Sequence, residues 1–170
     1  FFKQKTAYEM NLAYEGFKSM HMCPRCSTTL SNFEVNQGYK DITDISVYIL
    51  FTLVDSPDTS ILAWTTTPWT LPGNVALAVG ENIEYVKVKS EDKFLIVAKE
   101  KISLLGNGIE VVDTLKGSDL IGKSYIPLFD YYSSDGDLEN VKNGWKVYSA
   151  DFVTTEDGTG IVHIAPAFGD

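Results

Sequence analysis

The sequence predicts a mainly β domain with minor helix, built as a closed β-barrel of the six-stranded type with short peripheral helices. Short segments with a period of two and many β-branched residues recur along the chain. Each of these segments is bounded by Gly, Pro, Asn, Asp or Ser residues, which favour turns. Strands at this density favour a barrel or a closed pair of sheets.

Seven segments are expected to form strands. In the first, Ile45, Val47, Ile49, Phe51 and Leu53 alternate with other residues, which is the pattern of a strand with one buried face. The other expected strands are Ser60–Thr66, Tyr85–Lys89, Phe94–Ala98, Glu110–Leu115, Val147–Phe152 and Gly160–Ala165. Helices are expected only at two short segments, Asn74–Val79 and Lys99–Leu105.

Three parts are expected along the chain. Residues 1–10 share no pattern with the rest of the chain and are interpreted as a non-native leader sequence. Residues 11–40 are interpreted as a connector, formed by a short helix or turn and a hairpin, that carries Cys23 and Cys26. Residues 41–170 contain all the expected strands and are interpreted as one domain.

The composition is that of a folded chain with an acidic surface. With 44% hydrophobic and 12% aromatic residues, the 170 residues can bury a core. The formal net charge of -9 argues against binding DNA or RNA mainly by long-range attraction, because phosphates are repelled. No apolar run approaches the roughly 20 residues that span a bilayer, and no secretory leader opens the chain. A cytoplasmic protein without a membrane partner is therefore expected.

A cluster of hydroxyl groups marks the end of the second expected strand. Trp64 is followed by Thr65, Thr66 and Thr67, and Pro68 then removes a backbone donor and turns the chain. Threonines in a buried strand usually only pack. A cluster beside a proline-fixed loop also offers several groups that both donate and accept hydrogen bonds, so a binding site is an equally good interpretation.

The last expected strand carries a single histidine. It begins after Gly158, Thr159 and Gly160, whose glycines permit a close approach of the backbone. His163 is expected on the strand face opposite its two aliphatic neighbours. A lone histidine in an apolar strand is more often a satisfied core residue than a catalytic one. A chemical role for His163 therefore needs a second observation.

That second observation is a resemblance to a known family. Together, the threonine and histidine segments resemble the signature stretches of the editing domain inserted in class I aminoacyl-tRNA synthetases for isoleucine, valine and leucine. The resemblance covers nearly all of the chain and extends to Cys23–Cys26, Gly38–Asp44 and Gly122–Phe129. Thr67 resembles the isoleucine branch, because the valine and leucine enzymes carry arginine at that position. His163 agrees with this branch, because the valine enzymes tend to carry lysine there.

The resemblance implies a hydrolytic proofreading function. The implied reaction removes valine wrongly esterified to the 3′ end of isoleucine tRNA, and the implied partners are that tRNA end and the synthetic core of the same parent enzyme. An apolar pocket gains only about 1–3 kcal/mol from the one methylene by which isoleucine exceeds valine, a general figure for which the isoleucine enzymes are the standard example. A second site that admits only valine multiplies this discrimination. The hydrolysis is implied to need no cofactor, whereas ATP and magnesium belong to the synthetic core.

The resemblance also implies roles for individual residues. Thr65, Thr66, Thr67 and His163 are implied to be catalytic: the hydroxyls hold the terminal adenosine and orient the attacking water, and the histidine helps to exclude isoleucine. The implied substrate-binding residues are Trp64, Thr70, Asn74, Gly158, Thr159, Gly160 and Phe168. No general base is evident. The family's aspartate that binds the substrate ammonium group is expected two residues past Asp170, so this C-terminally truncated segment alone is expected to be a poor hydrolase.

The two cysteines suggest a metal site. Cys23 and Cys26 form one Cys-Pro-Arg-Cys unit, a spacing that suits a metal better than a disulfide. A structural zinc site needs four ligands, and the chain has no further cysteine, so this unit is half of such a site. The resemblance implies a second cysteine pair beyond the editing insertion, and zinc is therefore expected in the full-length parent.

Three other functions have some support in the sequence. Gly117–Ser124 matches the phosphate-binding loop pattern, but Pro127 and β-forming residues occur where that loop needs a helix. Asp58-Thr59-Ser60 resembles an aspartic-protease signature, but the second such motif is missing. The main alternative is a non-catalytic β-barrel that docks tRNA or another domain.

Overall fold

The computed structural model describes residues 20–106 and 108–168 of the chain. The chain divides into two compact units at the boundary between Ile42 and Thr43. The leader expected at residues 1–10 and the first part of the connector lie outside the described residues. None of the helices in the described part is both long and apolar enough to cross a membrane.

The first unit contains a tight turn followed by a short helix. A β-bridge between Met22 and Thr29 closes the turn that carries the two cysteines. Helix α1 (Asn32–Gln37) begins after Ser31, whose hydroxyl accepts a hydrogen bond from the backbone N–H of Glu34 while the Glu34 carboxylate accepts one from Ser31 N–H. This capping box satisfies two backbone donors that would otherwise lack partners.

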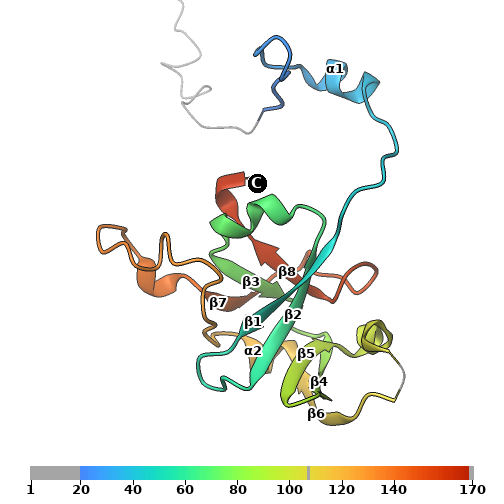
Figure 1. The fold of residues 1–170 in the computed structure, drawn as a ribbon, viewed down its shortest axis with the longest axis vertical. Coiled ribbons are helices and arrows are strands. Elements are labelled where there is room, and N and C mark those ends of the chain that lie inside the picture. Colours follow the sequence, from blue (N-terminus) through green and yellow to red (C-terminus); the bar gives the residue numbers. More distant parts are fainter. Residues whose placement is uncertain (1–19, 107, 169–170) are drawn as a thin grey trace, which may run out of the picture. The chain divides into compact units, whose positions relative to one another are not determined.

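In residues 43–106 and 108–168, the second unit has eight strands in two sheets (Figure 1). The larger sheet has the order β1-β2-β5-β4-β6 and the smaller one the order β7-β3-β8. The strands are β1 (Val47–Thr52), β2 (Thr59–Thr65), β3 (Ala76–Val79), β4 (Glu84–Ser90), β5 (Lys93–Ala98), β6 (Val111–Lys116), β7 (Lys146–Ser149) and β8 (Ile161–Ile164). The short helices are η1 (Pro68–Gly73), η2 (Lys99–Leu105), α2 (Gly117–Leu120), η3 (Val141–Asn143) and η4 (Pro166–Phe168).

Both sheets are mixed and open, so the mainly β class is confirmed and the closed six-stranded barrel is wrong. Within the described residues, the edge strands β1 and β6 of the larger sheet do not pair with each other. β2 pairs parallel with β5, and β3 pairs parallel with β7. The period-two pattern predicts a strand but not its partner. The central strands β2 and β5 are buried on both faces, which is typical of parallel pairing.

The main core contains residues from both sheets. Phe51 and Ile61 of the larger sheet share one apolar cluster with Leu77 and Ile161 of the smaller sheet, and all four are almost fully buried. Tyr125 joins this cluster through an edge-to-face contact with Phe51, with ring centroids 5.1 Å apart. A second cluster, centred on the opposite-facing residues of β4 and β5, packs against residues of η2.

The helix predicted at Asn74–Val79 is wrong, because residues 76–79 form strand β3. A short apolar run with alanines fits a helix or a buried strand equally well from its periodicity. Here β3 lies between β7 and β8 and hydrogen-bonds to both, so tertiary pairing overrides the local preference. The helical prediction at Lys99–Leu105 is confirmed as η2, which ends before Gly106.

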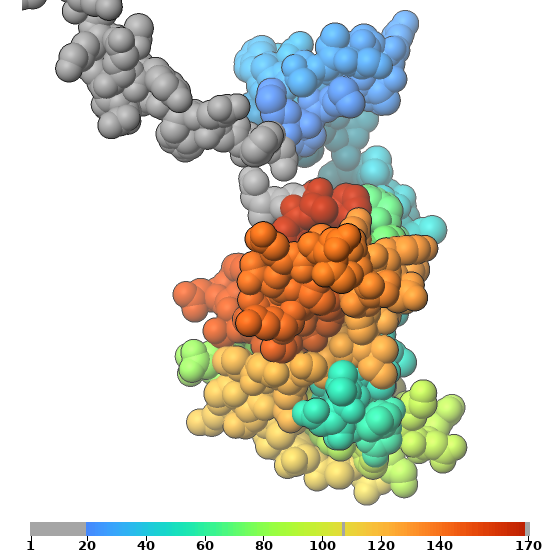
Figure 2. Space-filling model, turned by 90° about the vertical axis from the view of Figure 1, so that its left-hand side faces the viewer, coloured from blue at the N-terminus to red at the C-terminus, as the bar shows by residue number. Residues whose placement is uncertain are grey.

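The rejected phosphate-binding loop lacks the helix that it would need. Residues 117–120 form the four-residue helix α2 inside the motif, and the chain then turns at Gly122. Ser124 and Tyr125 make β-bridges to Lys146 and Leu53 instead of starting a helix. The long segment between these bridges and β7 covers one face of the unit beside the C-terminal residues (orange and red in Figure 2).

Candidate functional site

The threonine segment forms a hydrogen-bonded turn at the end of β2. Thr65 is the last residue of β2 and is buried, whereas Thr66 and Thr67 are exposed. The Thr65 hydroxyl accepts a hydrogen bond from Thr67 N–H at 3.1 Å. Pro68 then starts η1, in which the Thr70 hydroxyl lies 2.7 Å from the Thr67 carbonyl and donates to it. The prediction that Pro68 turns the chain is confirmed.

His163 on β8 contacts this turn directly. Its Nε2 lies 2.8 Å from the hydroxyl oxygen of Thr70, and its Nδ1 lies 3.2 Å from the amide nitrogen of Asn74. The partly buried ring lies on the sheet face shared with its β3 partner Leu77. The two signature segments thus meet, 93 residues apart in sequence, through a direct hydrogen bond and without an open gap between these two side chains.

Asn74 holds the centre of this arrangement and is almost fully buried. Its amide nitrogen donates to the Ala76 carbonyl at 3.0 Å, and its amide oxygen accepts from the Tyr125 hydroxyl at 2.7 Å. Its backbone carbonyl accepts from the Trp145 indole N–H at 3.1 Å. The buried polar groups of Asn74 therefore have partners, as a stable buried amide requires. Sequence reasoning did not find Tyr125 or Trp145, because no local pattern links them to Asn74.

A small cleft of about 260 Å³ lies between residues of the two signature segments. One wall is Trp64, Thr65 and Thr66, and the other is the segment Asp157–Val162. The two walls meet closely at Gly158: a Cβ at this residue would lie 2.9 Å from the Trp64 ring. Thr65 joins the cleft to the hydrogen-bonded turn, because this residue lines the cleft wall and its hydroxyl lies 3.2 Å from that of Thr67.

The glycine segment is fixed by hydrogen bonds from the larger sheet. The buried Tyr85 hydroxyl donates to the Gly160 carbonyl at 2.8 Å, and Ala98 N–H donates to the Thr159 carbonyl at 3.0 Å. Burial raises the pKa of the Tyr85 hydroxyl to about 12, so this donor keeps its proton at neutral pH. The cleft wall therefore has a defined backbone geometry.

The predicted site residues fall into two adjoining groups. Trp64, Thr65, Thr66, Gly158, Thr159 and Gly160 line the cleft. Thr67, Thr70, Asn74 and His163 form the hydrogen-bonded group. Phe168 belongs to neither group: it packs against Gly73, where a Cβ would lie 2.4 Å from its ring.

Burial lowers the pKa of the His163 imidazole below its ordinary value of 6.5. The folded state therefore binds this proton less well than the unfolded state does. Stability from this residue is present above pH 6.5 and is lost as the pH falls toward the lower folded-state pKa.

We expect the free energy of unfolding of the native chain to decrease on acidification through this window, and His163→Gln to remove part of that decrease. Urea unfolding of both proteins at a series of pH values on either side of 6.5 checks this. Parallel pH profiles for the two proteins would contradict it.

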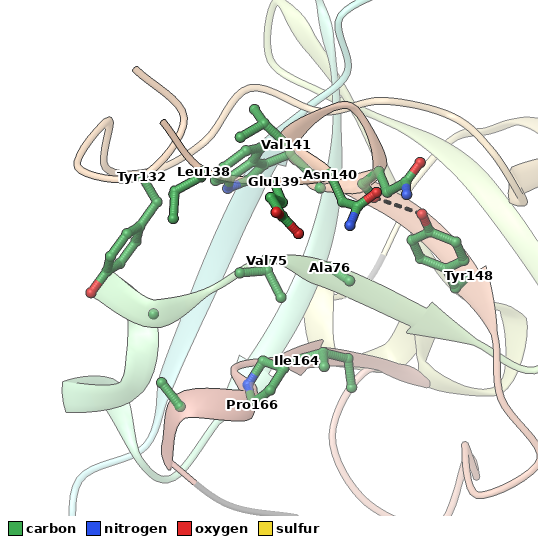
Figure 3. Close-up of a pocket in the computed structure, with 15 residues that line it drawn as sticks. Val75, Ala76, Tyr132, Leu138, Glu139, Asn140, Val141, Tyr148, Ile164 and Pro166 are labelled. Carbon is green, nitrogen blue, oxygen red and sulfur yellow. Dashed lines mark hydrogen bonds between the residues drawn. The ribbon is translucent and has the colours of Figure 1, made fainter. Parts of the chain in front are cut away.

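A larger cavity, of about 590 Å³, lies elsewhere in the second unit. Figure 3 shows Leu138, Glu139 and Val141 on one side of it and Val75 and Ile164 on the other. On β8 Ile164 follows His163, and successive side chains of a strand point to opposite faces. The cavity is therefore on the sheet face that points away from the imidazole, and its lining is mostly apolar. Its size alone does not make it the reaction site.

The two cysteines lie in the tight turn of the first unit as free thiols. Cys23 N–H donates to the Thr28 carbonyl at 2.9 Å, and the Sγ of Cys26 lies 3.1 Å from the Thr28 hydroxyl. Hydrogen bonds from Thr28 and then from Cys23 lower the pKa of the exposed Cys26 thiol. Residues 20–106 and 108–168 contain no group of three or more potential metal ligands.

The fold is that of the editing domains of class I aminoacyl-tRNA synthetases. A solved structure described as GlLeuRS-CP1 matches with a TM-score of 0.58 at 18% identity, over 72% of this chain and 55% of that one. The cytosolic leucyl-tRNA synthetase editing domain of P. knowlesi matches with a TM-score of 0.52 at 13% identity, over 75% of this chain and 60% of that one. No protein-family model matches the chain.

Sequence relatives identify the synthetase family to which the chain belongs. The isoleucine–tRNA ligase of Bdellovibrio bacteriovorus is 47% identical over 169 residues, which cover 96% of this chain and 16% of that protein. The isoleucine–tRNA ligase of Bacillus thuringiensis is 48% identical over 166 residues, which cover 97% of this chain and 15% of that protein. The probable cytoplasmic isoleucine–tRNA ligase of Dictyostelium discoideum is 44% identical over 96% of this chain. The chain belongs to the isoleucine–tRNA ligase family and spans about 15% of the length of these relatives.

Proposed function

We propose that this chain is the editing part of an isoleucine–tRNA ligase, which hydrolyses valine from mischarged isoleucine tRNA. The observation that carries the proposal is the 2.8 Å contact between Thr70 and His163, which joins the two signature segments; residues of both segments also line one small cleft. The parent enzyme would attach isoleucine to its tRNA with ATP and magnesium at a synthetic core outside this chain. The partner would be the 3′ end of that tRNA.

The cleft suits the end of a substrate. Its volume of about 260 Å³ is below the roughly 300–1,000 Å³ of typical ligand pockets, so it would enclose only the aminoacylated terminus. The exposed Thr66 and Thr67 hydroxyls can hydrogen-bond the ribose and a water molecule. The glycine segment opposite permits the backbone to approach the bound ester. With a net charge of -9, the chain would hold this end by local contacts.

The proposed chemistry is ester hydrolysis in which the site positions a water molecule against the ester. Holding a water against the ester and donating hydrogen bonds to the developing oxyanion can supply much of the rate without a covalent intermediate. His163 is not assigned as general base, because both of its ring nitrogens have hydrogen-bond partners within the protein. Its proposed role is to shape the wall that rejects isoleucine. No cofactor is assigned to this step.

The turn that holds Cys23 and Cys26 fits half of a structural zinc site. Two thiols lie in one turn, and the hydrogen bonds on Cys26 favour the thiolate that binds metal. Two further ligands from the parent would complete a tetrahedral site. Zinc is therefore proposed for the full-length enzyme as a structural element outside the hydrolytic site.

The proposal is tested by deacylation in the full-length enzyme that contains this segment. Thr66→Ala is expected to slow hydrolysis of valyl-tRNA roughly tenfold or more, because a misplaced water reacts poorly. His163→Ala is expected to admit isoleucyl-tRNA, so the ratio of the two hydrolysis rates falls. The measurement is the release of labelled amino acid from each charged isoleucine tRNA.

The matched control is Thr114→Ala, which removes an exposed hydroxyl on the edge strand β6. It is expected to leave both hydrolysis rates unchanged, and all three variants are expected to aminoacylate normally. Unaltered proofreading in Thr66→Ala and His163→Ala would instead favour the alternative, a module that docks tRNA or another domain without catalysis.

A further inference from the structure

Tyr125 is a fully buried residue outside both signature segments, and the proposed hydrolysis does not use it. Its ring packs edge-to-face on Phe51, and its backbone N–H donates to the Trp145 carbonyl at 3.0 Å. Its hydroxyl reaches Asn74, 51 residues earlier, at 2.7 Å. The core therefore fixes the position of one hydroxyl group next to the candidate site.

The orientation of the Asn74 amide follows from its neighbours. The Ala76 carbonyl can only accept, so the amide nitrogen must face it, at 3.0 Å. The amide oxygen then faces Tyr125 and accepts from its hydroxyl. The reversed amide would place two oxygen acceptors against each other at Ala76. The second N–H of Asn74 is left to point at His163 Nδ1, 3.2 Å away.

This orientation determines the tautomer of His163. Because Nδ1 faces a donor, it must act as the acceptor, and the proton of the neutral ring is on Nε2. Nε2–H then donates to the Thr70 hydroxyl, which in turn donates to the Thr67 carbonyl. Each donor in the series has an acceptor. In the other tautomer, Nδ1–H would face the N–H of Asn74, and the Thr70 hydroxyl would have to leave its carbonyl.

We propose that Tyr125 is a positioning residue that, together with the Ala76 carbonyl, holds the Asn74 amide in this orientation and so fixes the imidazole of His163 as the Nε2–H tautomer that donates to Thr70. The imidazole is then a hydrogen-bond donor of fixed direction that links β8 to the threonine turn. The burial that lowers the pKa of His163 favours the same neutral form. The contribution of this tautomer to substrate selection rests on the proposed function, whereas the tautomer itself does not.

The first test needs no activity. In the isotopically labelled native chain, ¹⁵N spectra of the histidine ring are expected to show a protonated Nε2 and an unprotonated Nδ1 for His163 at neutral pH. Tyr125→Phe keeps the ring on Phe51 but removes the donor to Asn74, so the difference between the two nitrogen shifts is expected to shrink. Tyr85→Phe is the matched control, because it also removes a buried hydroxyl but one that bonds Gly160 instead of Asn74.

Two results would overturn the inference: a native His163 protonated at Nδ1, or nitrogen shifts that change equally in Tyr125→Phe and Tyr85→Phe. If Tyr125→Phe does not fold, Thr70→Val supplies the second variant, because it removes the acceptor at Nε2 and nearly preserves side-chain shape. A histidine spectrum in Thr70→Val identical to that of the native chain would also count against the inference.

The second test uses hydrolysis by the full-length enzyme. Tyr125→Phe is expected to narrow the ratio of valyl-tRNA to isoleucyl-tRNA hydrolysis by about three- to tenfold, the usual effect of one lost hydrogen bond. Tyr148→Phe, which removes an exposed hydroxyl bonded to Asn143, is expected to leave the ratio unchanged. A confirmed tautomer with no hydrolysis in the native enzyme would refute the proposed function but not the fixed tautomer. An unchanged ratio in an active Tyr125→Phe enzyme would refute the link to selection.

Discussion

Phe51→Ala is expected to lower the free energy of unfolding by about 3–5 kcal/mol. Phe51 has no solvent exposure and is in the core cluster shared by the two sheets. Truncating it removes the apolar ring and leaves a cavity that the surrounding strands cannot fill completely. The ring also supports Tyr125, so the variant is expected to loosen the group around Asn74. Urea unfolding of the native and variant chains measures the change.

Leu50→Ala is the matched control, because Leu50 precedes Phe51 on β1 and its side chain is 45% exposed on the opposite face. Its expected effect is within roughly 0.5 kcal/mol, as for most surface substitutions. Equal losses of stability in the two variants would contradict the described core. They would show that the face of β1 that carries Phe51 is not its buried face.

Gly160→Ala is expected to destabilise the second unit and to abolish the proposed hydrolysis. Gly160 has a φ of 73°, in the left-handed region that costs a non-glycine residue about 1–2 kcal/mol. A Cβ would also lie 2.6 Å from the Cβ of Ala98, a short side chain that cannot turn away. The backbone must therefore shift, and with it the carbonyl that accepts from Tyr85. The part of the cleft wall that Gly160 forms would therefore be displaced.

Gly122→Ala separates the two causes. Gly122 has a φ of 82°, but a Cβ there would meet nothing within 4 Å. This variant carries the conformational cost without the clash, so its loss in unfolding free energy is expected to be clearly smaller, and hydrolysis by the full-length enzyme is expected to persist. If Gly122→Ala and Gly160→Ala lost equal stability, the close packing of Gly160 on Ala98 would be disproved.

The candidate site was only partly predictable from the sequence. Local patterns at strand ends indicated the threonine segment and His163 as candidate site residues. The family resemblance then predicted that the two segments belong to one site. The direct bond between Thr70 and His163 was not predicted, because no local pattern places two residues 93 positions apart in contact. Tyr125 was not predicted as a site residue, because its hydroxyl bonds Asn74 across 51 residues of sequence and no local pattern encodes that contact.

By itself the sequence determined the mainly β class, the position of most strands and the helical turn at Lys99–Leu105. These features depend on periodicity and on turn residues, which are local properties of the chain. Only the tertiary structure decided that the sheets are mixed and open, and that residues 76–79 are a strand. It also decided which side chains form hydrogen bonds with the two ring nitrogens of His163. Strand partners and buried hydrogen bonds depend on contacts between residues far apart in sequence, so their energies do not appear in any local pattern.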